Sequence, residues 1–151
     1  MQIDIFAIQK GDDEFCDINK KYIKLVKPFC NINEHNIFTK DILKAQNIDV
    51  NHARSSYGKE YVPKLSSGFN VALCEHGKMV DSIEFASFLQ SKSHVKFFIG
   101  GAYGFDDDFK NRCDLVISLS SLTFAHKLVK TILLEQIYRG FCINNNHPYH
   151  K

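Results

Sequence analysis

A glycine-rich segment carries the first residues whose types could bind a ligand. Gly100 and Gly101 open the sequence GGAYG, which directly follows the apolar run 95–99. Glycines there let the backbone approach a ligand closely, because no Cβ intervenes. A tight turn between a strand and a helix explains the same residues. The segment is not GxGxxG and no Lys-Ser/Thr pair follows it, so it does not predict a Rossmann or Walker loop.

A second candidate segment reads SLSSLTFAH and spans residues 118–126. Its hydroxyl residues and its apolar Leu119, Leu122 and Phe124 suit an adenine ring, which needs backbone amides and apolar walls. The alternative is a capped entry to the next helix, with Thr123 as the N-cap. The residues alone do not separate these two explanations. No serine stands in a GxSxG motif, so a serine hydrolase is not predicted.

The C-terminal segment NNNHPYHK combines imidazoles, a phenol and a cation. His147 and His150 form an HxxH pair, but no cysteine or carboxylate cluster accompanies it, so we predict no metal site. Tyr149 could stack on an unpaired base and Lys151 could hold a phosphate, whereas the simplest alternative is a frayed terminus. The preceding helix adds Glu135 and Arg139 at a spacing that pairs on one helix face. Residues 126–151 contain three lysines, one arginine and one acidic residue, which gives this segment a net charge of about +3.

Alternating strand and helix patterns must position these segments. The pattern predicts a largely parallel α/β sheet flanked by helices, with ligands at the carboxyl ends of the strands, in loops 74–77, 100–104 and 119–125. Residues 75–77 are expected to form a turn. Asp81 and Glu84 have the spacing of a capping box. The expected strands are 2–8, 29–38, 69–74, 95–99 and 115–119, and the expected helices are 12–26, 39–62, 81–90, 106–111 and 126–143.

Composition excludes several classes of protein. The 151 residues fit one domain, 1–151, and 44% hydrophobic with 24% charged residues is ordinary for a globular chain. No apolar run approaches the length of a membrane span, and the first residues do not resemble a signal peptide. Five cysteines at wide spacings favour free thiols in a reducing compartment, so we expect a cytoplasmic protein. The net charge of +2 neither requires nor excludes a nucleic-acid partner.

Two long segments resemble the ribosomal RNA large subunit methyltransferase H family of the SPOUT (α/β-knot) superfamily. They read FFIGGAYGF at 97–105 and DLVISLSSLTFAHKLVKTILLEQIYRGFCINNNHPYHK at 114–151, and ALCEHGK at 72–78 matches more loosely. The resemblance implies a trefoil knot near the C-terminus, a homodimer and S-adenosylmethionine as cofactor. It implies methylation of the position-3 ring nitrogen of a pseudouridine in large-subunit (23S) ribosomal RNA, within assembled ribosomes.

The resemblance also assigns roles to individual residues. His126, Glu135, Arg139, His147, Tyr149 and His150 match positions near the target base, and Arg139, Tyr149 and Lys151 match positions that contact RNA. The implied cofactor pocket comprises Leu73, Gly100, Gly101, Leu119, Ser120, Ser121, Leu122, Thr123 and Phe124. This chain departs from the family at Ala102, Ala125 and Lys151, where relatives often have proline, proline and arginine. Lysine keeps the charge but lacks the bidentate fork.

One mechanistic hypothesis and two alternatives follow. His126 or a tail histidine would accept the proton of the ring nitrogen, Arg139 would orient the base or a phosphate, and Glu135 would hold Arg139. The first alternative is a noncatalytic ribosome- or RNA-binding factor on the same fold. The second is a metal-dependent hydrolase that uses the two tail histidines. The cofactor-type loops argue against the first alternative, and the second has the least support because no cysteine or carboxylate cluster accompanies the histidines.

Overall fold

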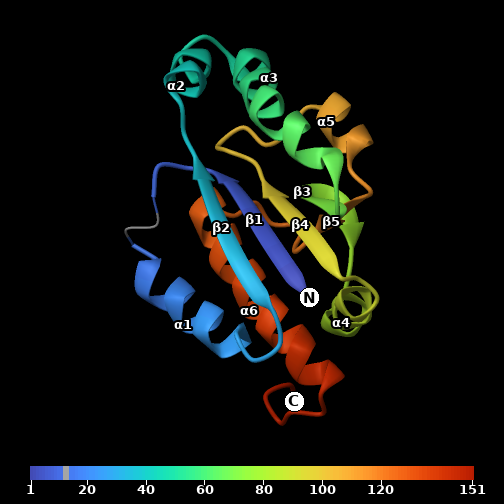
Figure 1. The fold of residues 1–151 in the computed structure, drawn as a ribbon. Coiled ribbons are helices and arrows are strands. Elements are labelled where there is room, and N and C mark those ends of the chain that lie inside the picture. The colour runs from blue at the N-terminus through green and yellow to red at the C-terminus, as the bar shows by residue number, and fades with distance from the viewer. Residues whose placement is uncertain (12–13) are drawn as a thin grey trace.

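A five-stranded parallel sheet organises the chain (Figure 1). The computed structural model describes residues 1–11 and 14–151. The spatial order is β2-β1-β4-β3-β5, which confirms the predicted parallel α/β sheet. The trefoil knot stays a prediction from the resemblance. The strands are β1 (Gln2–Ile8), β2 (Asn31–Ile37), β3 (Phe69–Met79), β4 (His94–Ile99) and β5 (Leu115–Ser118).

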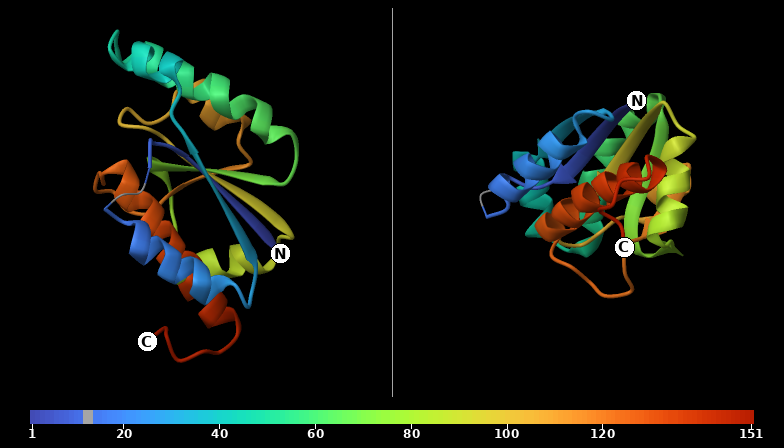
Figure 2. Two further views of the ribbon diagram at one scale, coloured as in Figure 1. Left: turned by 60° about the vertical axis from the view of Figure 1, so that its left-hand side comes forward. Right: turned by 90° about the horizontal axis from the view of Figure 1, so that it is seen from below.

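Two groups of helices cover opposite faces of the sheet (Figure 2). One face packs against α1 (Cys16–Val26), α4 (Ser82–Gln90) and α6 (His126–Asn144). The other packs against α2 (Lys40–Gln46), α3 (Val50–Tyr61) and α5 (Asp107–Arg112), and the 3-10 helix η1 (Val62–Ser66) continues α3. This division follows from the alternation of side chains along each strand. In β1, Ile3 and Ile5 enter the first core, whereas Phe6 and Ile8 enter the second.

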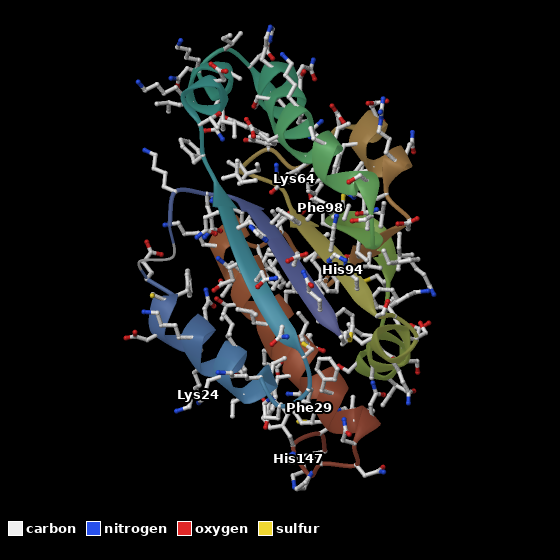
Figure 3. All side chains as sticks on the ribbon, in the orientation of Figure 1. Lys24, Phe29, Lys64, His94, Phe98 and His147 are labelled. Carbon is white, nitrogen blue, oxygen red and sulfur yellow. The ribbon has the colours of Figure 1, made fainter. Side chains whose placement is uncertain are left out.

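The α3 side of the sheet changes character along its length. Phe98 lies near the carboxyl end of β4 and is fully buried beneath α3 and α5. His94 begins the same strand and lies on the same face (Figure 3). It is only partly buried, and its Nε2 lies 2.7 Å from Asp4 Oδ2. Because the apolar residues gather at the carboxyl ends of the strands, α3 and α5 pack there, beside the predicted ligand loops.

The segment 39–62, which has no clean sequence period, is helical as predicted and divides into two helices. Thr39 Oγ1 accepts a hydrogen bond from Ile42 N at 3.2 Å at the start of α2. Asp49 Oδ1 accepts one from His52 N at 2.8 Å at the start of α3. Each side chain satisfies a backbone donor that the first helical turn leaves unpaired.

The turn predicted at 75–77 is wrong. β3 continues to Met79 and pairs with β5 on both sides of an irregularity between Leu73 and Lys78. Gly77 allows this pairing, because a Cβ there would lie 2.7 Å from the backbone carbon of Ile117. The sequence CEHGK resembles a turn because glycine, which favours turns, also occurs where two backbones approach closely.

The predicted helix starts have mixed outcomes. The capping box of α4 is confirmed, because Asp81 Oδ1 accepts from Glu84 N at 2.8 Å and Glu84 Oε2 accepts from Asp81 N at 3.2 Å. Thr123 is not the cap of α6, which begins after Ala125 with no side-chain cap. The first helix begins at Cys16, and the predicted start at 12–13 lies outside the described residues.

The described helices give no candidate for a membrane span, since none combines sufficient length with sufficient apolar character. All five cysteines are free thiols, in agreement with their wide spacing in the sequence. Burial raises the pKa of the Cys30 thiol to about 11 and that of Cys113 to about 12, so both stay protonated and uncharged near neutral pH.

Candidate functional site

The three predicted loops meet around one cavity of about 1070 Å³ at the carboxyl ends of β4 and β5. Most of the predicted cofactor residues line it. The part of β3 that replaces the expected turn forms one wall, and α3 and α5 contribute the rim. A cavity of this size and place is the usual ligand site of a parallel α/β sheet. The predicted residues that line it are Leu73, Gly100, Gly101, Leu119, Ser120, Leu122, Thr123 and Phe124.

The glycine loop is both a tight turn and a cavity wall, so its two sequence-based explanations are compatible. Gly104 N donates to Gly101 O at 3.1 Å, and Gly104 has a φ of +69°, which favours glycine. A Cβ on Gly100 would lie 3.0 Å from Gly104 Cα. A Cβ on Gly101 would lie 2.7 Å from the ring of Tyr57. Gly100 is confined by backbone and Gly101 by side chains, so neither position has room for a Cβ, and both residues line the cavity.

The loop 119–125 combines apolar walls with hydroxyl groups. Ser120 Oγ accepts from Leu122 N at 3.0 Å, and Ser120 O accepts from Ser118 Oγ at 2.7 Å, so the turn is held internally. Thr123 Oγ1 donates to Glu75 Oε2 at 2.5 Å. That bond joins this loop to β3 across the site. Ser121 is exposed and is not among the residues that line the cavity.

His126 is the one predicted catalytic residue that lines the cavity. It is the first residue of α6, so the loop before it brings its ring to the cavity wall. Burial lowers the pKa of the imidazole, and the positive charge of Lys127 lowers it further. A neutral imidazole has a free ring nitrogen that can accept a proton. His126 is therefore suited to serve as a general base at neutral pH.

Four of the other five predicted catalytic residues form a separate cluster, which we call the tail cluster: Glu135, Arg139, Tyr149 and His150. Arg139 Nε and Nη2 donate to Glu135 Oε1 at 3.0 and 2.5 Å, an ion pair that raises the pKa of Arg139. The guanidinium carbon also lies 4.8 Å from the centre of the Tyr149 ring. Arg139 Nη1 lies 3.4 Å from His150 Nδ1. The predicted pairing of Glu135 with Arg139 is confirmed.

The tail folds back on α6 beyond this cluster. His147 N donates to Cys142 O at 2.8 Å, and His147 Nδ1 accepts from Tyr149 N at 3.3 Å. The final residue, Lys151, is exposed. The tail is thus ordered against the helix, which differs from a frayed terminus.

The tail cluster is distant from the cavity of its own chain. His126 and Glu135 are nine residues apart on one helix, a separation of about 14 Å along its axis. None of the tail-cluster residues is among those that line the cavity. One chain therefore does not bring all the predicted catalytic residues to one point.

The tail histidines do not form a metal-binding arrangement. Within residues 1–11 and 14–151, no three histidine, cysteine or acidic side chains gather closely enough to hold an ion. His150 faces the guanidinium of Arg139, whose positive charge repels a cation. The donor set thus gives no support to the metal-dependent hydrolase.

Several cavity residues have no counterpart in the sequence-based prediction. Arg54 comes from α3, where the sequence has no clear period. The expected helix 106–111 contributes Asp106, Asp107 and Lys110 to the cavity lining, although the sequence gives that helix no role in the site. The sequence feature that points to Glu75 and His76 as site residues is their position directly after an expected strand. The sequence places loop 74–77 at the ligand end of the sheet, and the structure shows that Glu75 and His76 line the cavity as part of the continuous strand β3.

An all-parallel sheet with a ligand-sized cavity at its strand ends is typical of an α/β enzyme, and comparison with known families gives the class. The family described as "Predicted SPOUT methyltransferase" matches residues 1–150. The chain therefore belongs to the SPOUT methyltransferases.

Individual relatives narrow this assignment. The chain is 51% identical over 151 residues to "Ribosomal RNA large subunit methyltransferase H" of Campylobacter jejuni subsp. jejuni serotype O:23/36 (strain 81-176). It is 49% identical over 152 residues to the protein of that name from Aliarcobacter butzleri (strain RM4018), and 45% identical over 153 residues to that from Sulfurovum sp. (strain NBC37-1). Each alignment covers 100% of both chains. The chain thus belongs to the ribosomal RNA large subunit methyltransferase H family.

Proposed function

We propose that this protein transfers a methyl group from S-adenosylmethionine to the position-3 ring nitrogen of a pseudouridine in large-subunit ribosomal RNA. The substrate is the assembled ribosome, the enzyme acts as a homodimer in the cytoplasm, and one cavity per chain binds the cofactor. The observation that carries the proposal is the meeting of the glycine loop and the loop 119–125 around one cavity. The names of its relatives support the substrate class.

The cavity suits the proposed cofactor in shape and charge. Gly100 and Gly101 line the cavity, so the backbone of the glycine loop can contact a ligand directly. Leu119, Leu122 and Phe124 supply apolar surface for an adenine ring. S-adenosylmethionine is positively charged at sulfur and at its amine, and the carboxylates of Glu75 and Asp106 also line the cavity. When bound, the cofactor supplies an activated methyl group on its sulfonium sulfur.

The chain's own residues then orient the base and remove a proton. Methyl transfer to the ring nitrogen would break the methyl–sulfur bond and leave a neutral thioether, and the neutral imidazole of His126 would accept the proton that the ring nitrogen releases. Arg139 orients the base or a neighbouring phosphate, and Glu135 holds the guanidinium in place. His147 and His150 are the alternative proton acceptors. Lys151 and Tyr149 contact RNA by charge and stacking.

The distance between the two groups of residues supports the homodimer. The tail cluster is remote from the cavity of its own chain, as the spacing along α6 requires. A second copy can bring its tail cluster to the first copy's cavity. In that arrangement, one subunit holds the cofactor and the other contacts the RNA.

Methyl transfer from labelled S-adenosylmethionine to ribosomes that lack the modification tests the proposal. Mass spectrometry of the recovered RNA locates the label. We expect it on the ring nitrogen of one large-subunit pseudouridine, and ribosomes that already carry the modification serve as the matched control. Label on another atom would show that the proposed methyl acceptor is wrong. Label on free RNA but not on ribosomes would show that the assembled ribosome is not the substrate.

The same experiment separates the noncatalytic alternative. A ribosome-binding factor would bind ribosomes with the same affinity whether or not S-adenosylmethionine is present, and it would transfer no label. Absence of both cofactor binding and label, with an active control methyltransferase in parallel, would establish that alternative. The glycine loop lines a ligand-sized cavity, which favours a methyltransferase over a noncatalytic binding factor.

A further inference from the structure

One face of α3 contacts the glycine loop at three successive points. Tyr61 Oη donates to Ile99 O at 2.8 Å, at the last residue of β4. Tyr57 packs against Gly101 so closely that a Cβ on Gly101 would lie 2.7 Å from the phenol oxygen. Arg54 Nε donates to Tyr103 O at 2.8 Å. The spacing 54, 57, 61 corresponds to one face of a helix, so a single rigid element contacts the loop from its start to its end.

We propose that this face of α3, which we call the loop brace (Arg54, Tyr57 and Tyr61), sets the conformation of residues 100–104 and thereby the affinity for the cofactor. The inference rests on the proposed function. It assigns a positioning role to a segment whose sequence shows no motif. It also gives α3 a function in the site beyond covering the sheet.

Because Tyr57 and Tyr61 are buried, loss of either hydroxyl contact would be energetically costly. Both side chains are fully buried, so an unpaired hydroxyl would lose its hydrogen bonds to water without replacement. Tyr57 Oη accepts from Gln46 Nε2 at 2.6 Å. Burial raises the pKa of Tyr57 and holds that of Tyr61 well above its ordinary value, so both phenols stay neutral and Tyr61 keeps its donor proton. The Ile99 carbonyl is therefore held by a donor that has no access to solvent.

Close packing transmits this constraint into the loop. Tyr57 and Ile8 both pack against Gly101, because a Cβ there would lie 2.7 Å from Tyr57 Oη and 3.0 Å from Ile8 Cγ2. A shift of the Tyr57 ring would leave space into which Gly101 could move. Because Gly101 O accepts from Gly104 N, such movement would also alter the turn.

Arg54 completes the brace at the exposed end of the loop. Its side chain lines the cavity, and its charge also reaches Asp107 at the start of α5. The pKa of Asp107 is lowered chiefly by its hydrogen bond with Lys110 and to a smaller extent by Arg54. Arg54 therefore links α3 to the loop by a hydrogen bond and to α5 by charge.

Three variants and one control test the brace. Tyr61→Phe and Tyr57→Phe remove a hydroxyl while keeping the ring, and Arg54→Ala removes the outer contact. Lys59→Ala changes an exposed cation of the same helix outside the brace and is the control. Calorimetric titration with S-adenosylmethionine measures affinity, and thermal unfolding without cofactor measures stability.

We expect Tyr61→Phe and Arg54→Ala each to weaken cofactor binding by about fivefold to tenfold, as loss of one hydrogen bond implies. The KM for cofactor should rise in proportion, while the KM for ribosomes and the kcat at saturating cofactor stay near those of the wild type. Lys59→Ala should match the wild type throughout. Unchanged cofactor affinity in all three brace variants would overturn the proposal.

Amide hydrogen exchange without any ligand separates this proposal from the proposed function. The brace predicts faster exchange at residues 100–104 in Tyr61→Phe and Arg54→Ala, but not in Lys59→Ala. If wild-type protein fails to bind S-adenosylmethionine while this pattern is observed, the proposed function is wrong and the brace is correct. Identical exchange in all variants would overturn the brace, whatever the ligand.

Discussion

Tyr149 Oη donates to Glu135 Oε1 at 3.0 Å, and the same oxygen accepts from Arg139 Nε and Nη2. One carboxylate oxygen therefore holds both the C-terminal tail and the guanidinium. The neighbouring oxygen, Oε2, accepts from Gln136 Nε2 at 2.6 Å. This shared acceptor makes the position of the tail and the position of Arg139 interdependent.

Replacing that acceptor tests the tail cluster. Glu135→Gln removes the charge that pairs with Arg139, so we expect faster amide exchange at 146–150 and loss of about 1 kcal/mol of stability. Methyl transfer under single-turnover conditions should fall by roughly tenfold or more, because a misplaced orienting group is costly. Glu60→Gln is the control, because Glu60 belongs to α3, which covers the opposite face of the sheet from α6. Wild-type rates of methyl transfer in Glu135→Gln would show that Glu135 has no role in positioning Arg139 for the reaction.

The lowered pKa of His126 gives a pH prediction with a definite sign. Because the folded protein binds this proton less readily than the unfolded chain, stability falls as the pH drops through the window below the ordinary histidine pKa. The imidazole should remain a proton acceptor in that window. The acidic limb of the single-turnover rate should therefore lie below the ordinary histidine pKa. If His126→Ala keeps the same limb and the same rate, a tail histidine is the acceptor.

Gly77 should tolerate no side chain. Gly77→Ala places a Cβ 2.7 Å from Ile117 C and 2.8 Å from Val116 O, which are backbone atoms and cannot move away cheaply. We expect a loss of about 1–3 kcal/mol in urea unfolding. Gly58→Ala is the matched control, since its Cβ would meet only Asp106 Oδ2 at 3.9 Å. That helical position should gain up to about 1 kcal/mol. Equal effects at both glycines would contradict the close approach of β3 and β5.

Lys151 should contribute to ribosome binding through charge alone. It is exposed, and no base-specific contact is needed for a cation to neutralise one phosphate. Lys151→Ala should weaken ribosome binding modestly and reduce the slope of log affinity against log salt by about one. Lys151→Arg should preserve the slope. Identical slopes for the alanine variant and the wild type would show that the last residue does not contact phosphate.

Local sequence patterns predicted the elements well where the physical signal is local. Alternation along β1 assigns its two faces, and the spacing of Asp81 and Glu84 predicts the cap of α4, because each depends on neighbours within a few residues. The predictions are wrong where contacts between residues far apart in the sequence decide the local structure. Thr123 has the chemistry of a cap, but its hydroxyl bonds Glu75, which is 48 residues away.

The sequence by itself determined the α/β class, the order of the elements and the glycine and hydroxyl loops at the strand ends. These follow from periodicity and residue chemistry, and the resemblance in the last third of the chain supplied the family. Only the tertiary structure decided that β3 runs past Gly77, that Tyr57 and Tyr61 contact the glycine loop, and that the tail cluster is remote from His126. These arrangements depend on packing between segments far apart in the chain, which no local pattern encodes.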